Sequence, residues 1–204
     1  MINLCGQDFP TRRNVELVEF LKALNGSNWI ESKSLWQETK EAVQKQTWAE
    51  PLLESDISPY SKQYVAFGSA YNFFSYSFLQ WARKTHLPRF FTELEGLKKS
   101  YSPDEILWAT LNRFPDAPGG VSNQLVNDPK LSRTVMWKRT GQKCHGPRFR
   151  NWICIFGIGD LEFILNDEKI DAAVGKYRPF FANKFDDDGD DLVLQCLEYL
   201  LHES

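Results

Sequence analysis

The sequence predicts an α/β fold in which helices flank a mixed sheet. Segments with the helical period of apolar residues alternate, unevenly, with short apolar runs of strand length. The hydrophobic content of 42% is ordinary for a globular chain. The chain also contains 15 Phe, 7 Tyr and 7 Trp, which is enough large rings to fill a sizeable core.

The N-terminal segment predicts a strand followed by a helix. Residues 2–5 have the apolar character of a short strand, which Gly6 and Pro10 end. A helix is expected over residues 15–24, with Thr11 or Asn14 as its cap, and Gly26 stops it. Its expected apolar face consists of Leu17, Val18, Leu21 and Leu24.

The rest of the chain continues the alternation of helices and strands. A turn is expected at residues 115–120, a loop or poorly ordered helix at 31–46 and a linker at 51–59. Strands are expected at residues 64–67, 135–138 and 152–156, and helices at 78–84, 87–99, 102–112, 161–165 and 191–202.

The net charge of −3 argues against a chain that binds polyanions over its whole surface. Five basic residues nevertheless lie between Lys138 and Arg150 without an acidic one. Arginine forks match phosphate oxygens, so this loop suits a diphosphate, unless it is only a solvated basic loop. A nucleic-acid partner is not expected, because it needs a wider basic surface.

Five Asp surround one Gly between Asp186 and Asp191. An EF-hand loop is excluded, because Lys184 and Gln195 would occupy positions that need carboxylates. A metal–nucleotide motif remains the alternative. Because the run directly precedes a helical pattern, we expect it to cap that helix.

The four cysteines are too few for a disulfide scaffold at this length. Cys144 and Cys154 are close enough in sequence to staple a local loop. No zinc site is expected, since the sequence has no CxxC pair and its three His are scattered. Residues 156–160 lack the third Gly of a dinucleotide-binding loop.

Ser102 to Glu105 form a strong helix start. Ser102 and Glu105 have the spacing of a capping box, and Pro103 suits the first helical position. The alternative is that the Glu105 carboxylate points into a cleft and accepts a proton.

Secretion signals are weak in the sequence. The N-terminus has no basic region followed by a long apolar stretch, which taken alone indicates a cytosolic chain. One glycosylation sequon starts at Asn25 and matters only in a secretory protein.

Five stretches carry a family resemblance: INLCGQDFP (residues 2–10), FGSAY (67–71), YSPDEILWAT (101–110), CIFGIGDL (154–161) and FANKFD (181–186). With them the chain resembles the core 2 and I-branching β-1,6-N-acetylglucosaminyltransferases of glycosyltransferase family 14, which also includes the peptide O-xylosyltransferases. The resemblance implies a GT-A-like fold. It also implies inverting transfer of GlcNAc from UDP-GlcNAc to the 6-hydroxyl of GalNAc or Gal on O-glycans, without a metal or other cofactor.

The same resemblance implies roles for individual residues. Glu105 matches the family's general base. Lys184 matches the lysine that neutralises the departing diphosphate. The matching arginine is taken as Arg150 by counting from Cys144, whereas counting back from Cys154 gives Asn151, since the loop has one extra residue.

Acceptor binding is implied for Glu31 and Trp137. A family Tyr is replaced by Arg139, and a basic pair of the family falls on Thr39 and Ala42, with Lys40 only nearby. The resemblance also implies a Cys144–Cys154 disulfide and a free Cys5, and the family partner of Cys196 is not in this sequence.

The resemblance covers the C-terminal half of the family's chains. Residues 1–204 are therefore expected to be the acceptor and catalytic part of a single domain, without the N-terminal nucleotide-binding part and the Golgi membrane anchor. A UDP-sugar and an O-glycan or glycoprotein acceptor are the expected partners. The alternative is a truncated, inactive family member or a non-catalytic glycan-binding fragment.

Overall fold

A computed structural model describes residues 1–34, 64–85, 102–121, 130–171, 174–186 and 189–203. The chain divides into two compact units, which are described separately. Unit 1 contains Met1–Asn3 and Leu24–Lys130, and unit 2 contains Leu4–Ala23 and Leu131–Ser204. The expectation that the whole chain belongs to one domain stays a prediction.

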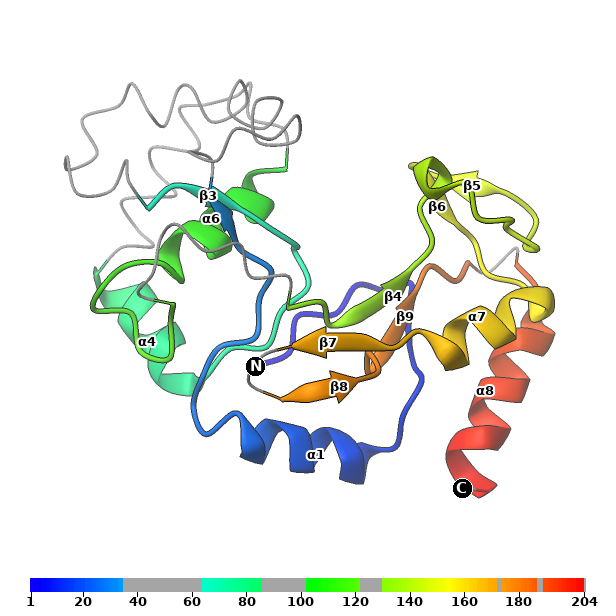
Figure 1. Cartoon of the computed structure of the whole chain (residues 1–204), viewed down its shortest axis with the longest axis horizontal. Coiled ribbons are helices and arrows are strands. Elements are labelled where there is room, and N and C mark those ends of the chain that lie inside the picture. Colours follow the sequence, from blue (N-terminus) through cyan, green and yellow to red (C-terminus); the bar gives the residue numbers. More distant parts are fainter. Residues whose placement is uncertain (35–63, 86–101, 122–129, 172–173, 187–188, 204) are drawn as a thin grey trace. The chain divides into compact units, whose positions relative to one another are not determined.

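The described residues of unit 1 form two helices and a short antiparallel pair of strands. The helices are α4 (Tyr76–Thr85) and α6 (Pro103–Leu111). Strand β2 (Lys33–Ser34) pairs with β3 (Ala66–Phe67), with Lys33 opposite Phe67. Strand β3 lies beside α6 (Figure 1). The predicted helices at 78–84 and 102–112 and the turn at 115–120 are confirmed, and the predicted strand at 64–67 is confirmed in its second half.

The predicted strand at residues 2–5 is wrong. Only Ile2 forms a bridge, with Phe73, and Phe73 also pairs with Trp29. The chain then turns, because the Asp8 carboxylate and the Cys5 carbonyl oxygen accept the backbone N–H groups of Cys5 and Asp8, respectively. A strand starts only at Asp8.

The core of unit 1 is aromatic and aliphatic. Phe74 lies 4.9 Å from Phe78 and 4.9 Å from Trp108, measured between ring centroids. These rings pack α4 against α6, and the buried members of the cluster are Ile30, Val65, Phe67, Phe74, Phe78, Ala82, Ile106, Leu107 and Leu111.

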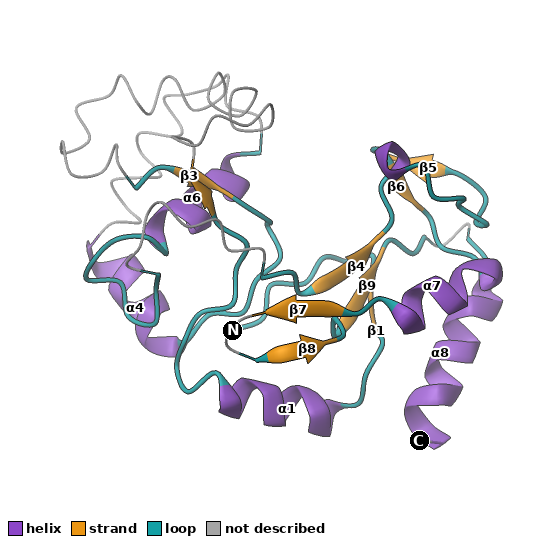
Figure 2. Ribbon diagram, in the orientation of Figure 1, coloured by secondary structure: helices purple, strands orange, loops and turns teal. Residues whose placement is uncertain are grey.

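Unit 2 contains the mixed sheet that the sequence predicts. Strand β9 (Phe181–Asn183) lies between β1 (Asp8–Pro10) and β4 (Arg133–Val135). It is antiparallel to β1 and parallel to β4 (Figure 2). Strands β1 and β9 are not predicted from the sequence, and β4 starts and ends earlier than the predicted strand at 135–138.

The remaining elements of unit 2 are short, apart from two helices. Helix α1 spans Asn14–Ala23 and α8 spans Asp191–Glu203, as predicted, and α7 spans Leu161–Asn166. The described part of unit 2 also contains two hairpins and two 3-10 turns: β5 (Phe149–Arg150) with β6 (Ile153–Cys154), β7 (Lys169–Asp171) with β8 (Gly175–Tyr177), η1 (Lys138–Thr140) and η2 (Ile158–Asp160).

Helix α8 starts as the Asp run predicts. Asp190 Oδ1 accepts the backbone N–H of Leu192, and its Oδ2 accepts that of Ile158. The expected capping role is thus confirmed for Asp190. Val193 and Leu197 bury one side of the helix in a cluster with Met136, Cys154, Phe156, Ile164, Ala182 and Phe185.

Helix α1 departs from the prediction in its cap and in its apolar face. Thr11 Oγ1 donates to Pro179 O, and Asn14 is already the first residue of the helix. Glu16 accepts the Arg13 backbone N–H instead. Val18 is exposed, because Phe20 lies on the side of the helix that faces the protein. The ring centroids of Phe20 and Phe180 are 4.8 Å apart.

Several predictions lie outside the described residues. They are the helix at 87–99, the linker at 51–59, most of the segment 31–46 with Thr39, Lys40 and Ala42, and Asp187 and Asp188 of the acidic run. Among the described helices, none combines the length and apolarity needed to cross a membrane.

Candidate active site

Glu105 lies on the first turn of α6 and is half-buried. Pro103 occupies the first position of the helix as predicted, but the predicted capping box is wrong. Ser102 has φ 52° and ψ 64°, and its side chain makes no capping hydrogen bond. A capping serine normally has extended backbone angles that aim its hydroxyl at the helix, and the left-handed conformation does not.

Gly68 joins the main chains of Glu31 and Glu105. Its backbone N–H donates to the Glu105 carbonyl oxygen at 2.8 Å. On its other side, a Cβ placed on Gly68 would lie 1.7 Å from the Glu31 carbonyl oxygen. Only a residue without a side chain fits there. The structure therefore brings together two predicted site residues that are far apart in sequence.

Glu31 carries its own cationic partner. Lys33 Nζ lies 2.9 Å from Glu31 Oε1, and both side chains are largely shielded from solvent. Sequence reasoning missed Lys33, since the basic pair was sought at Thr39 and Ala42. A local signal was present, because Glu31 and Lys33 carry opposite charges only two residues apart.

Arg113 links the segment that contains Glu31 to the helix that contains Glu105 through hydrogen bonds. It is fully buried, its Nε donates to Ser32 Oγ at 2.7 Å and its Nη2 donates to Ser32 O at 2.8 Å. Ser32 Oγ in turn donates to Ala109 O on α6. Nothing in the sequence distinguishes Arg113 from a solvated residue after a helix end.

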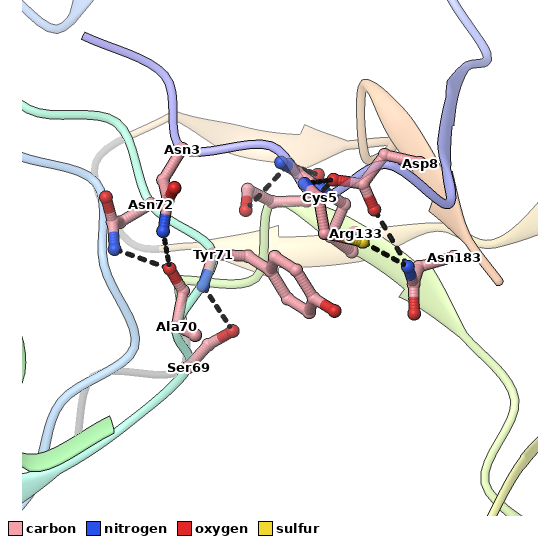
Figure 3. A network of polar contacts seen from close by, with 10 residues as sticks. Asn3, Cys5, Asp8, Ser69, Ala70, Tyr71, Asn72, Arg133 and Asn183 are labelled. Carbon is pink, nitrogen blue, oxygen red and sulfur yellow. Dashed lines mark hydrogen bonds and ion pairs between the residues drawn. The ribbon is translucent and has the colours of Figure 1, made fainter. Parts of the chain in front are cut away.

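Side-chain amides shape the loop that follows Gly68. The Nδ2 groups of Asn3 and Asn72 both donate to the Ala70 carbonyl oxygen, at 2.6 and 2.8 Å (Figure 3). The backbone N–H of Tyr71 donates to Ser69 Oγ. These bonds fix the FGSAY stretch next to the Glu31–Glu105 pair.

In unit 2, Asp186 binds two arginines of the basic loop. Arg150 Nη1 lies 2.8 Å and Arg148 Nη2 lies 3.1 Å from Asp186 Oδ2. Lys184 is buried two residues earlier, and its carbonyl oxygen accepts the Phe156 N–H. The structure therefore brings Arg150 to the segment that holds Lys184. Asp186 itself was expected to cap a helix, and its arginine partners were missed.

A buried ion pair anchors the strand that ends at Lys184. Arg133 Nε lies 3.2 Å from Asp8 Oδ2, and each side chain is 2% exposed. Asn183 Nδ2 donates to Asp8 Oδ1 at 2.9 Å and to Cys5 Sγ at 3.2 Å (Figure 3). Because Asn183 is the last residue of β9, this network sets where Lys184 leaves the sheet.

Trp137 lies between β4 and the basic loop and forms a bridge with Ile153. The Arg139 guanidinium carbon lies 5.4 Å from the Trp137 ring centroid.

Cys154, which follows Ile153 in the chain, forms the expected disulfide with Cys144. Cys5 and Cys196 keep reduced thiols, as expected for Cys5.

Comparison with known proteins identifies the family of this chain. The family model described as Core-2/I-Branching enzyme matches residues 1–165, which is most of the chain. This chain belongs to the Core-2/I-branching enzyme family.

Named relatives of this family member are enzymes. A sheep (Ovis aries) β-1,3-galactosyl-O-glycosyl-glycoprotein β-1,6-N-acetylglucosaminyltransferase 3 is 34% identical over the whole chain and 48% of the relative. A zebrafish (Danio rerio) transferase 4 of the same description is 33% identical over 100% of this chain and 49% of the relative. A mouse (Mus musculus) N-acetyllactosaminide β-1,6-N-acetylglucosaminyl-transferase is 32% identical over 99% of this chain and 50% of the relative.

The Core-2/I-branching chain described here spans about half the length of these curated relatives. Its predicted site residues divide between the two units: Glu31 and Glu105 belong to unit 1, and Trp137, Arg150 and Lys184 belong to unit 2. Asn25 of the sequon is exposed, with φ 46°.

Proposed function

We propose that this Core-2/I-branching family member transfers GlcNAc from UDP-GlcNAc to the 6-hydroxyl of GalNAc or Gal on O-glycans, with inversion and without a metal. The names of its relatives support the transferred sugar and the linkage. The observation that carries the proposal is the junction at Gly68, which holds a carboxylate at the start of α6 beside the segment of a second carboxylate.

Glu105 is the proposed general base. Its carboxylate takes the proton of the acceptor 6-hydroxyl while that oxygen attacks the anomeric carbon from the face opposite UDP. The bond from the anomeric carbon to UDP breaks, so the configuration inverts. A positioned base of this kind accelerates transfer by roughly 10²–10⁴-fold.

Arg150 and Lys184 are the proposed partners of the departing diphosphate. Their positive charges would stabilise the negative charge that grows on UDP, which is the role that a metal has in other transferases. Arg150 is held in place by Asp186 in the free protein, and Lys184 is shielded from solvent. A fixed cation needs little reorganisation when charge develops.

Glu31 and Trp137 are the proposed acceptor contacts. The Glu31 carboxylate accepts hydrogen bonds from sugar hydroxyls, while Lys33 supplies the opposing charge that keeps it in place. Trp137 offers the face of a large ring to the sugar.

As a transferase of this kind, the protein would act on glycoprotein O-glycans in the Golgi, and the exposed Asn25 would carry an N-linked glycan.

A transfer assay tests the proposal directly. The purified protein is incubated with UDP-GlcNAc and either a core 1 or a polylactosamine acceptor, with and without EDTA. We expect a β-1,6-linked GlcNAc product by NMR, formed at the same rate in EDTA. An α-linked product, or a rate that requires a divalent metal, would contradict the proposal, as would the absence of any product.

A further inference from the structure

The tip of the β5–β6 hairpin is strained in an unusual way. Its two turn residues, Asn151 and Trp152, have φ values of 50° and 66°. A two-residue hairpin turn with positive φ at both positions is usually Asn-Gly, since glycine carries no Cβ. A Trp in the glycine position is energetically unfavourable, because its Cβ meets the following carbonyl group.

Packing does not explain why a Trp occupies this turn. Its side chain is 67% exposed, so burial recovers little of the backbone strain. The hairpin is closed without it, because β5 pairs with β6 and Cys154 is bonded to Cys144. An exposed ring whose backbone is strained indicates a role other than folding.

A cation lies beside this ring. The Lys138 backbone N–H donates to Trp152 O at 2.8 Å, which fixes the two residues side by side. The Lys138 ammonium lies 5.5 Å from the Trp152 ring centroid and 5.8 Å from that of Phe149. No carboxylate among the residues that the structure describes forms an ion pair with Lys138. Figure 1 shows the hairpin beyond the end of β4, at an end of unit 2.

We propose that Trp152 and Lys138 form a binding site for an acidic sugar, one that carries a carboxylate or a sulfate. The apolar face of the pyranose stacks on the Trp152 ring, and the Lys138 ammonium pairs with the anionic group. The neighbouring Arg139 and Lys143 add positive potential. The choice of a carbohydrate rests on the proposed function, whereas the site itself rests on the geometry of the hairpin.

Calorimetric titration without UDP-GlcNAc tests this site apart from catalysis. The probes are 3′-sialyllactose, 6-sulfo-N-acetyllactosamine and neutral lactose, so that carboxylate and sulfate are compared. At least one acidic probe should bind about tenfold or more tightly than lactose. Salt should weaken that binding, because the ammonium is exposed. Equal binding of all three probes, or none, would overturn the proposal.

Trp152→Gly separates a ligand role from a structural one. Glycine suits a φ of 66°, so the melting temperature should stay unchanged or rise. Binding of the acidic sugar should fall about tenfold or more. Loss of binding together with a lower melting temperature would instead indicate a structural role for the ring.

Two further variants complete the test. Lys138→Met should remove the preference for acidic over neutral sugar. Tyr199→Ala removes another exposed ring, on α8, and should leave binding unchanged. Adsorption to phosphatidylserine vesicles without sugar binding would identify a membrane contact and refute the proposal. Sugar binding without GlcNAc transfer would refute the proposed function and leave this site standing.

Discussion

The backbone N–H of Gly68 donates to the carbonyl oxygen of Glu105 at 2.8 Å. This hydrogen bond links the end of β3 to the first turn of α6. The Glu31 carbonyl oxygen occupies the space that a side chain on Gly68 would need. The conformation of one small residue thus sets the spacing of two carboxylate-bearing segments.

Gly68→Ala should therefore impair both stability and transfer. A Cβ would lie 1.7 Å from Glu31 O, and a main-chain atom cannot swing aside. Overpacking of this kind costs about 1–3 kcal/mol, and a displacement of about 1 Å at the site lowers transfer about 10²-fold. Urea denaturation and a transfer assay measure the two effects.

Gly6→Ala is the matched control for this substitution. A Cβ on Gly6 meets nothing within 4 Å, so this variant should keep both its stability and its activity. A Gly68→Ala protein that transfers GlcNAc as fast as the Gly6→Ala protein would contradict the role given to the junction.

Arg150 and Arg148 both pair with Asp186, which makes them a test of the donor site. Arg150→Met should raise the KM for UDP-GlcNAc about tenfold or more, since a charge-assisted bond to phosphate is lost. Arg148→Met should change it less than about threefold. Equal effects of the two substitutions in steady-state kinetics would contradict the assignment of Arg150 as the diphosphate contact.

The Cys144–Cys154 bond should stabilise unit 2. It closes a short loop that includes Arg148 and Arg150, and such bonds contribute about 2–4 kcal/mol. Replacing both cysteines by serine should lower the free energy of unfolding by about that amount. Cys196→Ser, which removes a free thiol, should change it far less. A double variant as stable as the parent protein would contradict this prediction.

Glu16 gives the fold a predictable pH dependence. Burial raises its pKa, but hydrogen bonds from Arg12 and the Arg13 N–H, together with their charges, outweigh that effect and hold the pKa below the ordinary value of 4.5. A lowered folded-state pKa stabilises the protein above the ordinary pKa, and this contribution is lost as the pH falls through the lowered value.

Glu16→Gln should therefore lower the free energy of unfolding at pH 7 by about 0.5–1 kcal/mol. The difference from the parent protein should shrink as the pH drops below about 4.5. Glu19→Gln, which changes an exposed carboxylate of the same helix, is the control. Urea denaturation at several pH values measures both, and a Glu16 effect that persists in acid would contradict the assignment.

The longer helices could be predicted from the sequence because their signals are local. Pro103 and the apolar period that follows mark α6, and the Asp run marks the start of α8. Strands β1 and β9 have three residues each, which is too short for an alternating pattern to show. Their pairing depends on Asp8, Arg133 and Asn183, which lie far apart in the chain.

The residues of the candidate site also differ in whether a local sequence signal identifies them. Glu31, Glu105, Arg150 and Lys184 could be named because they stand in matching stretches of sequence. Gly68, which links two of them, and Arg113, which holds them, act through contacts across the fold that no local pattern reveals. The capping box failed for a related reason: the left-handed backbone of Ser102 cannot be seen in its residue type.

Glu105→Gln compared with Asp104→Asn tests the central claim most directly. The two carboxylates are neighbours on the first turn of α6, so their effects on the helix dipole are similar, but only Glu105 is the proposed base. We expect Glu105→Gln to lower the rate of GlcNAc transfer roughly 10²–10⁴-fold with UDP binding intact. Asp104→Asn should stay within about threefold of the parent protein. A Glu105→Gln protein that transfers GlcNAc at the rate of Asp104→Asn would contradict the assignment of Glu105 as the base.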